Sequence, residues 1–214
     1  MIITIDGPSG SGKSTIAKLI AKNNDITYID SGSIYRAIAY FLFNNNIDIT
    51  NEELISEALR DINLDYTKNG VLLNGRAIDS ELRTPEISQL ASKIAVYNYV
   101  RNKVNETIIN FSRNNDIIAE GRDMGSTVLP TAKYKFYLDA SPEIRAQRRY
   151  KQLKELNIDA DLNNIYNDII ERDYRDSNRS ISPLVIPKNS IIINSDRMTI
   201  DEVIKKIISY ISEE

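Results

Sequence analysis

The sequence contains no cysteine and no histidine. Without cysteine the chain has neither a disulfide framework nor a thiol nucleophile, and without histidine it lacks the commonest general base and metal ligand. The longest apolar run, Ala37 to Phe43, is too short to span a membrane. No basic segment precedes the first apolar run, so we expect no signal peptide and a cytoplasmic location.

The length and net charge of the chain further restrict the class of protein to which it can belong. A chain of 214 residues that is 42% hydrophobic is long enough for one domain, or for one domain with inserted lobes. The net charge of −3 argues against a protein that binds nucleic acid over its whole surface. Since nothing indicates an extended interface, we expect a monomer that binds neither nucleic acid nor a membrane.

Glycine is also scarce, with eight in the chain, yet three of the eight lie between positions 7 and 12. The segment Gly7 to Thr15 reads GPSGSGKST and matches the pattern G-x-x-x-x-G-K-[ST]. The apolar run Met1 to Ile5 precedes it, and the helix-forming run Ile16 to Lys22 follows. Strand, glycine loop and helix together form a phosphate cradle, in which backbone N–H groups and the helix N-terminus face the anion. A Gly/Ser turn with a solvated lysine is the alternative, but the flanking segments favour phosphate binding.

This loop predicts the donor side of a reaction. We expect Lys13 to reach the outer phosphates of a nucleoside triphosphate and the Ser14 hydroxyl to hold Mg²⁺, the expected cofactor. The loop residues expected to bind the triphosphate are Gly7, Pro8, Ser9, Gly10, Ser11, Gly12, Lys13, Ser14 and Thr15.

Short apolar runs alternate with helical segments along most of the chain, which predicts an α/β fold with a parallel sheet flanked by helices. The five expected strands are 1–5, 27–29, 117–119, 134–138 and 191–193. Capping boxes at Thr50 to Glu53 and Thr199 to Glu202 predict two helix starts. Ligands bind beyond the carboxyl ends of such strands, so Gly7, Asp30-Ser31-Gly32 and Gly121-Arg122-Asp123 should line one crevice.

The stretch from 62 to 78 has a different texture. Asn69-Gly70 and Asn74-Gly75 separate three short strand-like runs, and Asn-Gly is the strongest short hairpin signal. This predicts a small antiparallel meander. We therefore expect a single chain, 1–214, whose core of about 1–61 and 101–214 carries an inserted lobe at about 62–100.

The distribution of arginine is a second indication that the protein binds phosphate groups. Two helical segments each carry three arginines at spacings that place them on one face. Any single one could be a solvated ion-pair partner, but beside a phosphate loop in an acidic protein the set favours phosphate binding. The two sets are Arg145, Arg148 and Arg149, and Arg172, Arg175 and Arg179 with Asp176 on the same face; Arg36 and Arg122 add to them.

An arginine-rich site without histidine suits a kinase whose acceptor is itself a phosphate. Two unit charges ~5 Å apart repel by roughly 3 kcal/mol at an effective dielectric of ~20, and guanidinium groups offset that repulsion. A phosphate acceptor is largely ionised at pH 7, so it needs no general base, whereas a hydroxyl acceptor usually needs an aspartate. Asp30 or Asp123 could still serve as such a base. The absence of an Asn-Lys-x-Asp motif argues against a GTPase switch.

Further segments, spread over nearly the whole chain, match the motifs of one protein family. They are Asp30–Arg36, Leu82–Glu86, Ala91–Ala95, Val100-Arg101, Gly121–Gly125, Asp139–Ser141, Arg145–Arg149, Glu171–Arg179 and Pro183-Leu184. With these segments the sequence resembles the bacterial cytidylate kinases, a family of P-loop nucleoside monophosphate kinases. The resemblance implies a P-loop NTPase core, an enlarged nucleotide-monophosphate lobe at the predicted insertion and a short lid at about 145–180. It also implies ATP and CMP or dCMP as substrates.

The resemblance implies a role for individual residues. Cytosine would be read by Ser31, Arg101 and Asp123. The sugar would be held by Ser92, Arg172 and Asp176. The acceptor phosphate would be clamped by Arg36, Arg122 and Arg179. ATP would be covered by Arg148 and Arg149. The catalytic residues would be Lys13, Arg122, Asp123, Arg148 and Arg179.

Three alternatives remain open. The first is another small-molecule P-loop kinase, of the UMP, thymidylate or shikimate type. The second is a nucleotide-binding module without acceptor chemistry. The third is an RNA-binding protein that uses the arginine-rich segments, although the acidic balance of the chain conflicts with it.

Overall fold

The computed structural model describes residues 1–212 of the 214, apart from the side chains of Ser80, Arg83 and Ser212. Arg83, in one of the segments that carry the family resemblance, thus lies outside the described side chains. The chain divides into two compact units, residues 1–26 with 118–214 and residues 27–117. The predicted insertion at 62–100 falls inside the second unit. The division into core, lobe and lid stays a prediction.

Five strands form one sheet in the order β2-β6-β1-β7-β8. Strand β1 pairs in parallel with β7, and β7 pairs in parallel with β8. Strands β1 and β6 are buried almost throughout, as at Ile3 and Ile5, which explains why these two strands appear in the sequence as short apolar runs rather than alternating ones. The predicted five-stranded parallel sheet is confirmed. The strands are β1 Ile2–Asp6, β2 Thr27–Asp30, β6 Ile117–Gly121, β7 Tyr134–Asp139 and β8 Ile191–Asn194.

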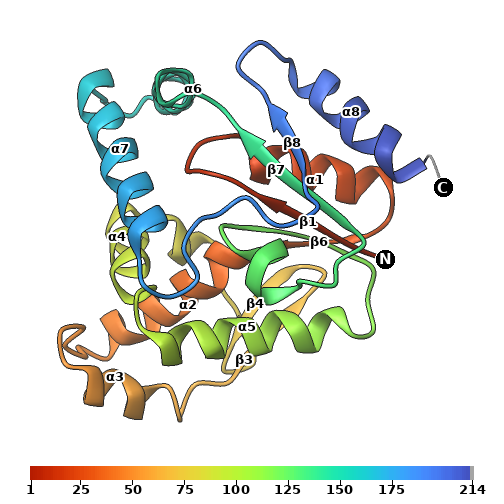
Figure 1. Ribbon diagram of the computed structural model, residues 1–214. Helices are drawn as coiled ribbons and strands as arrows, with labels where there is room; N and C mark the ends of the chain where they lie inside the picture. The colour runs from red at the N-terminus through yellow and green to blue at the C-terminus, as the bar shows by residue number, and fades with distance from the viewer. Residues whose placement is uncertain (213–214) are drawn as a thin grey trace. The chain divides into compact units, whose positions relative to one another are not determined.

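In the first unit, α1 packs against α8 and α6 packs against α7 (Figure 1). The capping box at Thr199 is confirmed, because the Thr199 side chain accepts from the Glu202 N–H at 3.3 Å and the Glu202 carboxylate accepts from the Thr199 N–H at 2.7 Å. The helices of this unit are α1 Lys13–Asn23, the π-helical turn η2 Met124–Val128, α6 Pro142–Glu155, α7 Leu162–Asn178 and α8 Ile200–Ser212.

In the second unit, α2 packs against α4, α5 and β4. The predicted meander is confirmed as an antiparallel sheet in the order β3-β4-β5, with Asn74 and Gly75 at positive φ in its second turn. The elements are α2 Ser31–Asn44, α3 Glu52–Ala58, β3 Leu64–Thr67, β4 Gly70–Leu73, β5 Arg76–Ala77, the 3₁₀ turn η1 Ser80–Arg83, α4 Pro85–Ile94 and α5 Asn98–Ser112.

The capping box predicted to begin at Thr50 is wrong. Helix α3 begins at Glu52, and Asn51 caps it by accepting hydrogen bonds from the N–H groups of Glu53 and Leu54. Thr50 instead donates its hydroxyl to the Asp48 carboxylate, which also accepts from the Thr50 N–H. Asparagine caps a helix at least as well as threonine, and a local turn on Asp48 engages the threonine.

None of the helices within residues 1–212 combines the length and the apolar character that crossing a bilayer requires.

Candidate active site

The glycine loop between β1 and α1 needs glycine for a steric reason. Gly7 has a φ of +150°, and a Cβ there would lie 2.1 Å from the carbonyl oxygen of Leu138. Gly12 has a φ of +99° and caps α1. The loop can therefore turn tightly and present its backbone N–H groups only with glycine at these positions.

Lys13 is buried at the start of α1, and its ammonium group folds over its own loop. It donates to the carbonyl oxygen of Pro8 at 2.6 Å and contacts the Ser11 hydroxyl at 3.4 Å. Burial lowers the pKa of Lys13, and the nearby guanidinium of Arg122 lowers it further. A bound triphosphate would restore the charge balance around this ammonium group, so Lys13 lies where outer phosphates are expected.

Ser14 lies beside an acidic residue. Its hydroxyl donates to a carboxylate oxygen of Glu120 at 2.5 Å, and Glu120 is only 6% exposed at the carboxyl end of β6. A hydroxyl that donates its proton to a carboxylate keeps its lone pairs for a cation. Mg²⁺ is usually bound by one or two carboxylates together with substrate phosphates, so this pair of oxygen donors fits that ion.

Asp6, the last residue of β1, is fully buried and holds the segment after β6. Its two carboxylate oxygens accept from the N–H groups of Met124 and Gly125 at 2.8 and 2.7 Å. Burial raises the pKa of Asp6 to about 6, although these hydrogen bonds oppose the shift. A Cβ at Gly125 would lie 2.8 Å from the Thr4 hydroxyl oxygen, so this close approach also depends on glycine. Asp6 thereby positions the backbone next to Arg122 and Asp123.

Four of the predicted acceptor-binding residues form one charged cluster in the first unit. The Arg122 guanidinium pairs with the Asp176 carboxylate at 2.8 Å. The Arg179 guanidinium lies 3.8 Å from Asp176 and 3.7 Å from Asp123, and the side chains of Arg179 and Asp123 are almost completely buried. The predicted Arg172 acts electrostatically on both Lys13 and Asp176. The structure thus brings the arginines of α7 and of the segment after β6 next to the loop lysine.

The electrostatics of this cluster reinforce its ionised state. Burial would raise the pKa of Asp176, but Arg122, Arg172 and Arg179 lower it, and the net direction is downward. Burial would lower the pKa of Arg122, but the Asp176 carboxylate raises it, and the net direction is upward. The site therefore keeps arginine charge available at any working pH.

The three arginines of α6 do not all face the glycine loop. Arg145 is buried, and Arg148 donates to the carbonyl oxygens of Ser11 at 3.5 Å and of Ser195 at 2.7 Å. Arg149 is exposed and donates to the side-chain oxygen of Gln152 at 2.8 Å. Positions i+3 and i+4 lie on opposite sides of position i, about 100° apart, so the shared spacing does not place both on the loop.

The same correction applies to α7. Arg175 is exposed and pairs loosely with Glu171 at 3.9 Å, whereas Asp176 and Arg179 face the cluster. The prediction that Arg175 shares their face is therefore wrong, because the apolar and charged stripe of α7 is narrower than the spacing suggested.

The other predicted residues lie in the second unit. Ser31 is buried at the start of α2, and Ser92 is half-buried on α4. The Arg36 guanidinium pairs with the Asp30 carboxylate at 2.7 Å, and Asp30 also caps α2 by accepting from the Ser33 N–H. Because these contacts occupy Asp30, it is poorly suited to act as a general base.

Arg101 is the largest fully buried side chain of the second unit. Its guanidinium donates to the carbonyl oxygen of Ala95 at 3.1 Å and lies over the Tyr35 ring, 5.6 Å from the centroid. These contacts fix the orientation of the guanidinium plane, as a residue that reads a planar base requires.

The family model for cytidylate kinase matches residues 3–213. A cytidylate kinase of Alkaliphilus oremlandii is 42% identical over 207 residues, which covers 97% of this chain and 95% of that protein. A cytidylate kinase of Clostridioides difficile is 40% identical over 212 residues, covering 99% of this chain and 98% of that protein. This chain belongs to the cytidylate kinase family.

Solved structures agree on the fold. A shikimate kinase from Bacteroides thetaiotaomicron aligns with a TM-score of 0.50 at 12% identity, covering 99% of this chain and 98% of that chain. An uncharacterized protein from Eubacterium ventriosum aligns with a TM-score of 0.56 at 14% identity, covering 100% and 99%. At such low identity the likeness shows only that this member of the cytidylate kinase family has the fold of small P-loop kinases.

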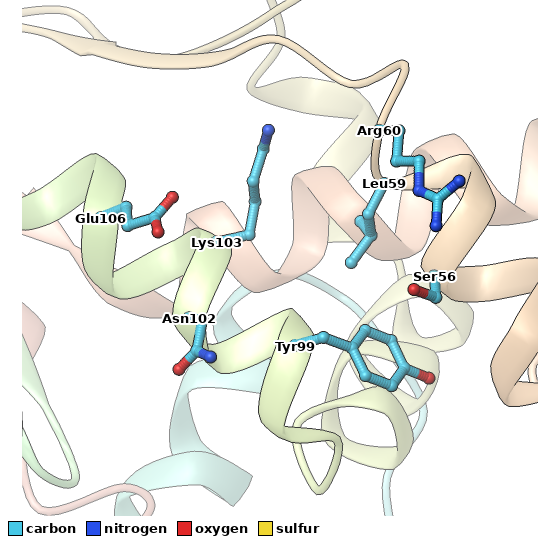
Figure 2. A pocket seen from close by; sticks show the side chains of 7 residues that line it. All are labelled: Ser56, Leu59, Arg60, Tyr99, Asn102, Lys103 and Glu106. Carbon is cyan, nitrogen blue, oxygen red and sulfur yellow. The ribbon is translucent and has the colours of Figure 1, made fainter.

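A separate cavity of about 330 Å³ lies in the second unit between α3 and α5 (Figure 2). It contains none of the residues predicted for the kinase site. Charged and polar side chains surround it without forming a cluster aimed at one point (Figure 2). Its lining residues are Ser56, Leu59, Arg60, Tyr99, Asn102, Lys103 and Glu106.

Four residues of the site were not predicted from the sequence in the roles that they have here. Asp6 ends strand β1 and Glu120 is the next-to-last residue of strand β6, so the rule that ligands bind at the carboxyl ends of parallel strands could also have found them. Arg145 belongs to the predicted phosphate-binding set, whereas the sequence assigns no role to Asp173. No local pattern indicates that these two residues pair with each other beside the loop.

Proposed function

We propose that this chain transfers the γ-phosphate of ATP to CMP or dCMP, which gives ADP and CDP or dCDP. The observation that carries the proposal is the charged cluster beside the loop lysine. Arg122 and Arg172 both act electrostatically on Lys13, and Arg122 pairs with Asp176 at 2.8 Å. Membership of the cytidylate kinase family supports the same reaction.

The arginines of the cluster suit a phosphate acceptor. An acceptor phosphate that approaches the γ-phosphate brings several repulsions of roughly 3 kcal/mol each at ~5 Å and an effective dielectric of ~20. Arg122 and Arg179, together with Arg36 of the second unit, offset this repulsion in the proposed reaction. Arg148 and Lys13 hold the donor phosphates from the side of the loop. No general base is needed, because the acceptor oxygen is already ionised near pH 7.

Asp123 provides the discrimination between bases. Its buried carboxylate can only accept hydrogen bonds, and the exocyclic amine of cytosine is a donor that uracil lacks. In the proposal, Ser31 and Arg101 also read the base, and Ser92, Arg172 and Asp176 hold the sugar.

Mg²⁺ is proposed at Ser14 and Glu120. The hydroxyl of Ser14 faces the carboxylate of Glu120, and both offer the oxygen donors that this ion prefers. When bound, Mg²⁺ would neutralise charge that develops on the transferring phosphoryl group. The chain itself fixes the Ser14 hydroxyl through the buried Glu120 carboxylate.

We also propose that parts of the chain close over the bound substrates. A lid at about 145–180, which carries Arg148 and the exposed Arg149, and a lobe at about 62–100 would exclude water, so that ATP is not simply hydrolysed. We propose a cytoplasmic monomer that binds ATP and CMP or dCMP, but neither nucleic acid nor a membrane.

A coupled ADP-release assay with CMP, dCMP, UMP, AMP and shikimate tests the proposal. We expect the fastest turnover with CMP or dCMP. Faster turnover with AMP or shikimate would refute the acceptor assignment, and ATP binding without any acceptor-stimulated release would refute the kinase. The Lys13→Ala variant should lose activity and keep its far-UV circular dichroism spectrum, which shows that the loss is not unfolding.

A further inference from the structure

One ion pair, between the buried Arg145 and the partly buried Asp173, engages both backbone polar groups of Ser9 in the ATP loop. The Arg145 guanidinium, 3% exposed, donates to the carbonyl oxygen of Ser9 at 2.8 Å and pairs with the Asp173 carboxylate at 2.6 Å. The other oxygen of Asp173 accepts from the N–H of Ser9 at 3.3 Å. A third bond, from the Arg145 guanidinium to the carbonyl oxygen of Ala140 at 2.8 Å, fixes the arginine at the start of α6. The Ser9 backbone therefore has its donor and its acceptor engaged by the same pair.

The pair also connects the loop to the helix that carries the acceptor residues. Asp173 lies on α7 directly after Arg172, and one turn before Asp176, which pairs with Arg122. Helices α6 and α7 contact each other (Figure 1). A displacement of α7 would therefore shift the position of Ser9, because charge-assisted hydrogen bonds connect the two directly.

Stability alone does not account well for this arrangement. A buried ion pair gains little over an apolar pair of the same volume, because desolvation of both charges offsets their attraction. What it provides is a fixed geometry, since each of its bonds is directional and strengthened by charge. Here the fixed distance is that between the donor loop and the acceptor side of α7.

We propose that Arg145 and Asp173 are positioning residues that couple the ATP loop to the acceptor-binding side of α7. Neither residue touches a substrate in this role. The pair transmits the position of the loop to Arg172 and Asp176, so that binding of one substrate alters the affinity for the other. The choice of CMP as the acceptor rests on the proposed function above, whereas the coupling of the loop to α7 does not.

The coupling is measured as the ratio of CMP dissociation constants without and with a non-hydrolysable ATP analogue and Mg²⁺, by titration calorimetry. We expect a ratio of about fivefold or more in the wild type, within the usual range for linked sites. In Asp173→Asn the ratio should fall below about twofold, while the affinity for the analogue alone changes less than about threefold. The matched control is Glu171→Gln, which removes the exposed partner of Arg175 on the same helix and should keep the ratio. An unchanged ratio in Asp173→Asn overturns the proposal.

A second variant guards against misfolding, because Asp173→Asn leaves the Arg145 charge buried. The double variant Arg145→Met with Asp173→Leu removes both charges at similar volume, which buried pairs often tolerate. It should show a cooperative unfolding transition and the same loss of coupling. A folded double variant that retains wild-type coupling overturns the proposal.

A third measurement does not depend on CMP. In the wild type, the ATP analogue bound at the loop should slow amide hydrogen exchange in residues 172–178 of α7, and this protection should disappear in Asp173→Asn. If CMP does not stimulate ADP release but this protection is present, the proposed function fails and the coupling stands. If the wild type shows neither protection nor a change in CMP affinity, the coupling is refuted.

Discussion

The Ser14 hydroxyl donates to the Glu120 carboxylate at 2.5 Å, across 106 positions of sequence. The first residue belongs to the phosphate loop, and the second is the next-to-last residue of the neighbouring strand β6. The pair brings a hydroxyl and a buried carboxylate together at the place where a cation would meet the phosphates of ATP. This makes Glu120 the clearest addition to the residues that the sequence indicated.

Glu120→Gln should weaken activation by Mg²⁺. Glutamine still offers an oxygen to the Ser14 hydroxyl, but it removes the negative charge. We expect the apparent affinity for Mg²⁺ to fall about 10- to 100-fold, as for other residues that orient a metal ligand, with little change in the rate at saturating Mg²⁺. The measurement is ADP release against free Mg²⁺ at fixed ATP. Glu106→Gln on the exposed face of α5 is the control, and an unaltered Mg²⁺ dependence in Glu120→Gln would exclude this role.

Arg148 and Arg149 should differ, although they are adjacent in sequence. Arg148 donates to Ser11 and Ser195, whereas Arg149 donates to Gln152 at the surface. Loss of charge-assisted hydrogen bonds costs about 1.5–3 kcal/mol, so Arg148→Gln should lower kcat/KM for ATP about tenfold or more. Arg149→Gln should stay within about threefold. Equal losses in the two variants would mean that Arg149 turns inward when ATP binds.

Asp123→Asn should reduce the use of CMP far more than the use of UMP. The variant keeps the shape of the side chain but replaces one acceptor oxygen by a donor, which repels the amine of cytosine. We expect kcat/KM for CMP to fall about 10- to 100-fold, the value of one hydrogen bond to a charged group. Steady-state rates with both acceptors measure the effect. The exposed Asp168 supplies the control, Asp168→Asn, and a parallel loss on CMP and UMP would remove Asp123 from base reading.

Asp6 should make stability depend on pH in an unusual direction. Burial raises the pKa of Asp6 from 3.8 to about 6, so the folded ligand-free chain holds this proton more tightly than the unfolded chain. Its contribution to stability is therefore greatest below pH 4 and is lost as the pH rises through 6, by about 3 kcal/mol in total.

Asp6→Asn removes this titration, since asparagine does not ionise. It also loses one acceptor for the N–H groups of Met124 and Gly125, which is a cost that does not vary with pH. Relative to wild type, the variant should gain about 2 kcal/mol in free energy of unfolding between about pH 4.5 and 7.5. Urea unfolding of both proteins at the two pH values measures this difference. A constant difference would show that Asp6 titrates normally.

Much of the fold could be predicted because its signals are local. The apolar run before the loop, the glycines within it and the helix after it are contiguous, and their backbone preferences need no distant partner. The same holds for Asn74-Gly75, whose positive φ values form the turn of the meander. Even where the predicted capping residue Thr50 is wrong, the observed cap, Asn51, is its immediate neighbour.

The site was less predictable wherever its geometry depends on which elements become neighbours. Helical spacing grouped Arg148 with Arg149, but only the packing of α6 against the loop decides which of them faces it. Spacing grouped Arg175 with Arg179 in the same way, and the fold left Arg175 in solvent. A period of 3.6 residues defines a broad stripe, and it does not state which edge of the stripe becomes buried.

The amino-acid sequence alone is enough to predict the phosphate loop, the order of strands and helices along the chain, the meander and the residues that resemble those of cytidylate kinases. The partners of the buried groups follow instead from the packing of the folded chain: Glu120 for Ser14, the Met124 and Gly125 amides for Asp6, and Asp173 for Arg145. A charge can be buried only where an opposite charge or hydrogen-bonding groups compensate for its lost hydration. Those groups come from segments far away in sequence, so no local sequence pattern predicts them.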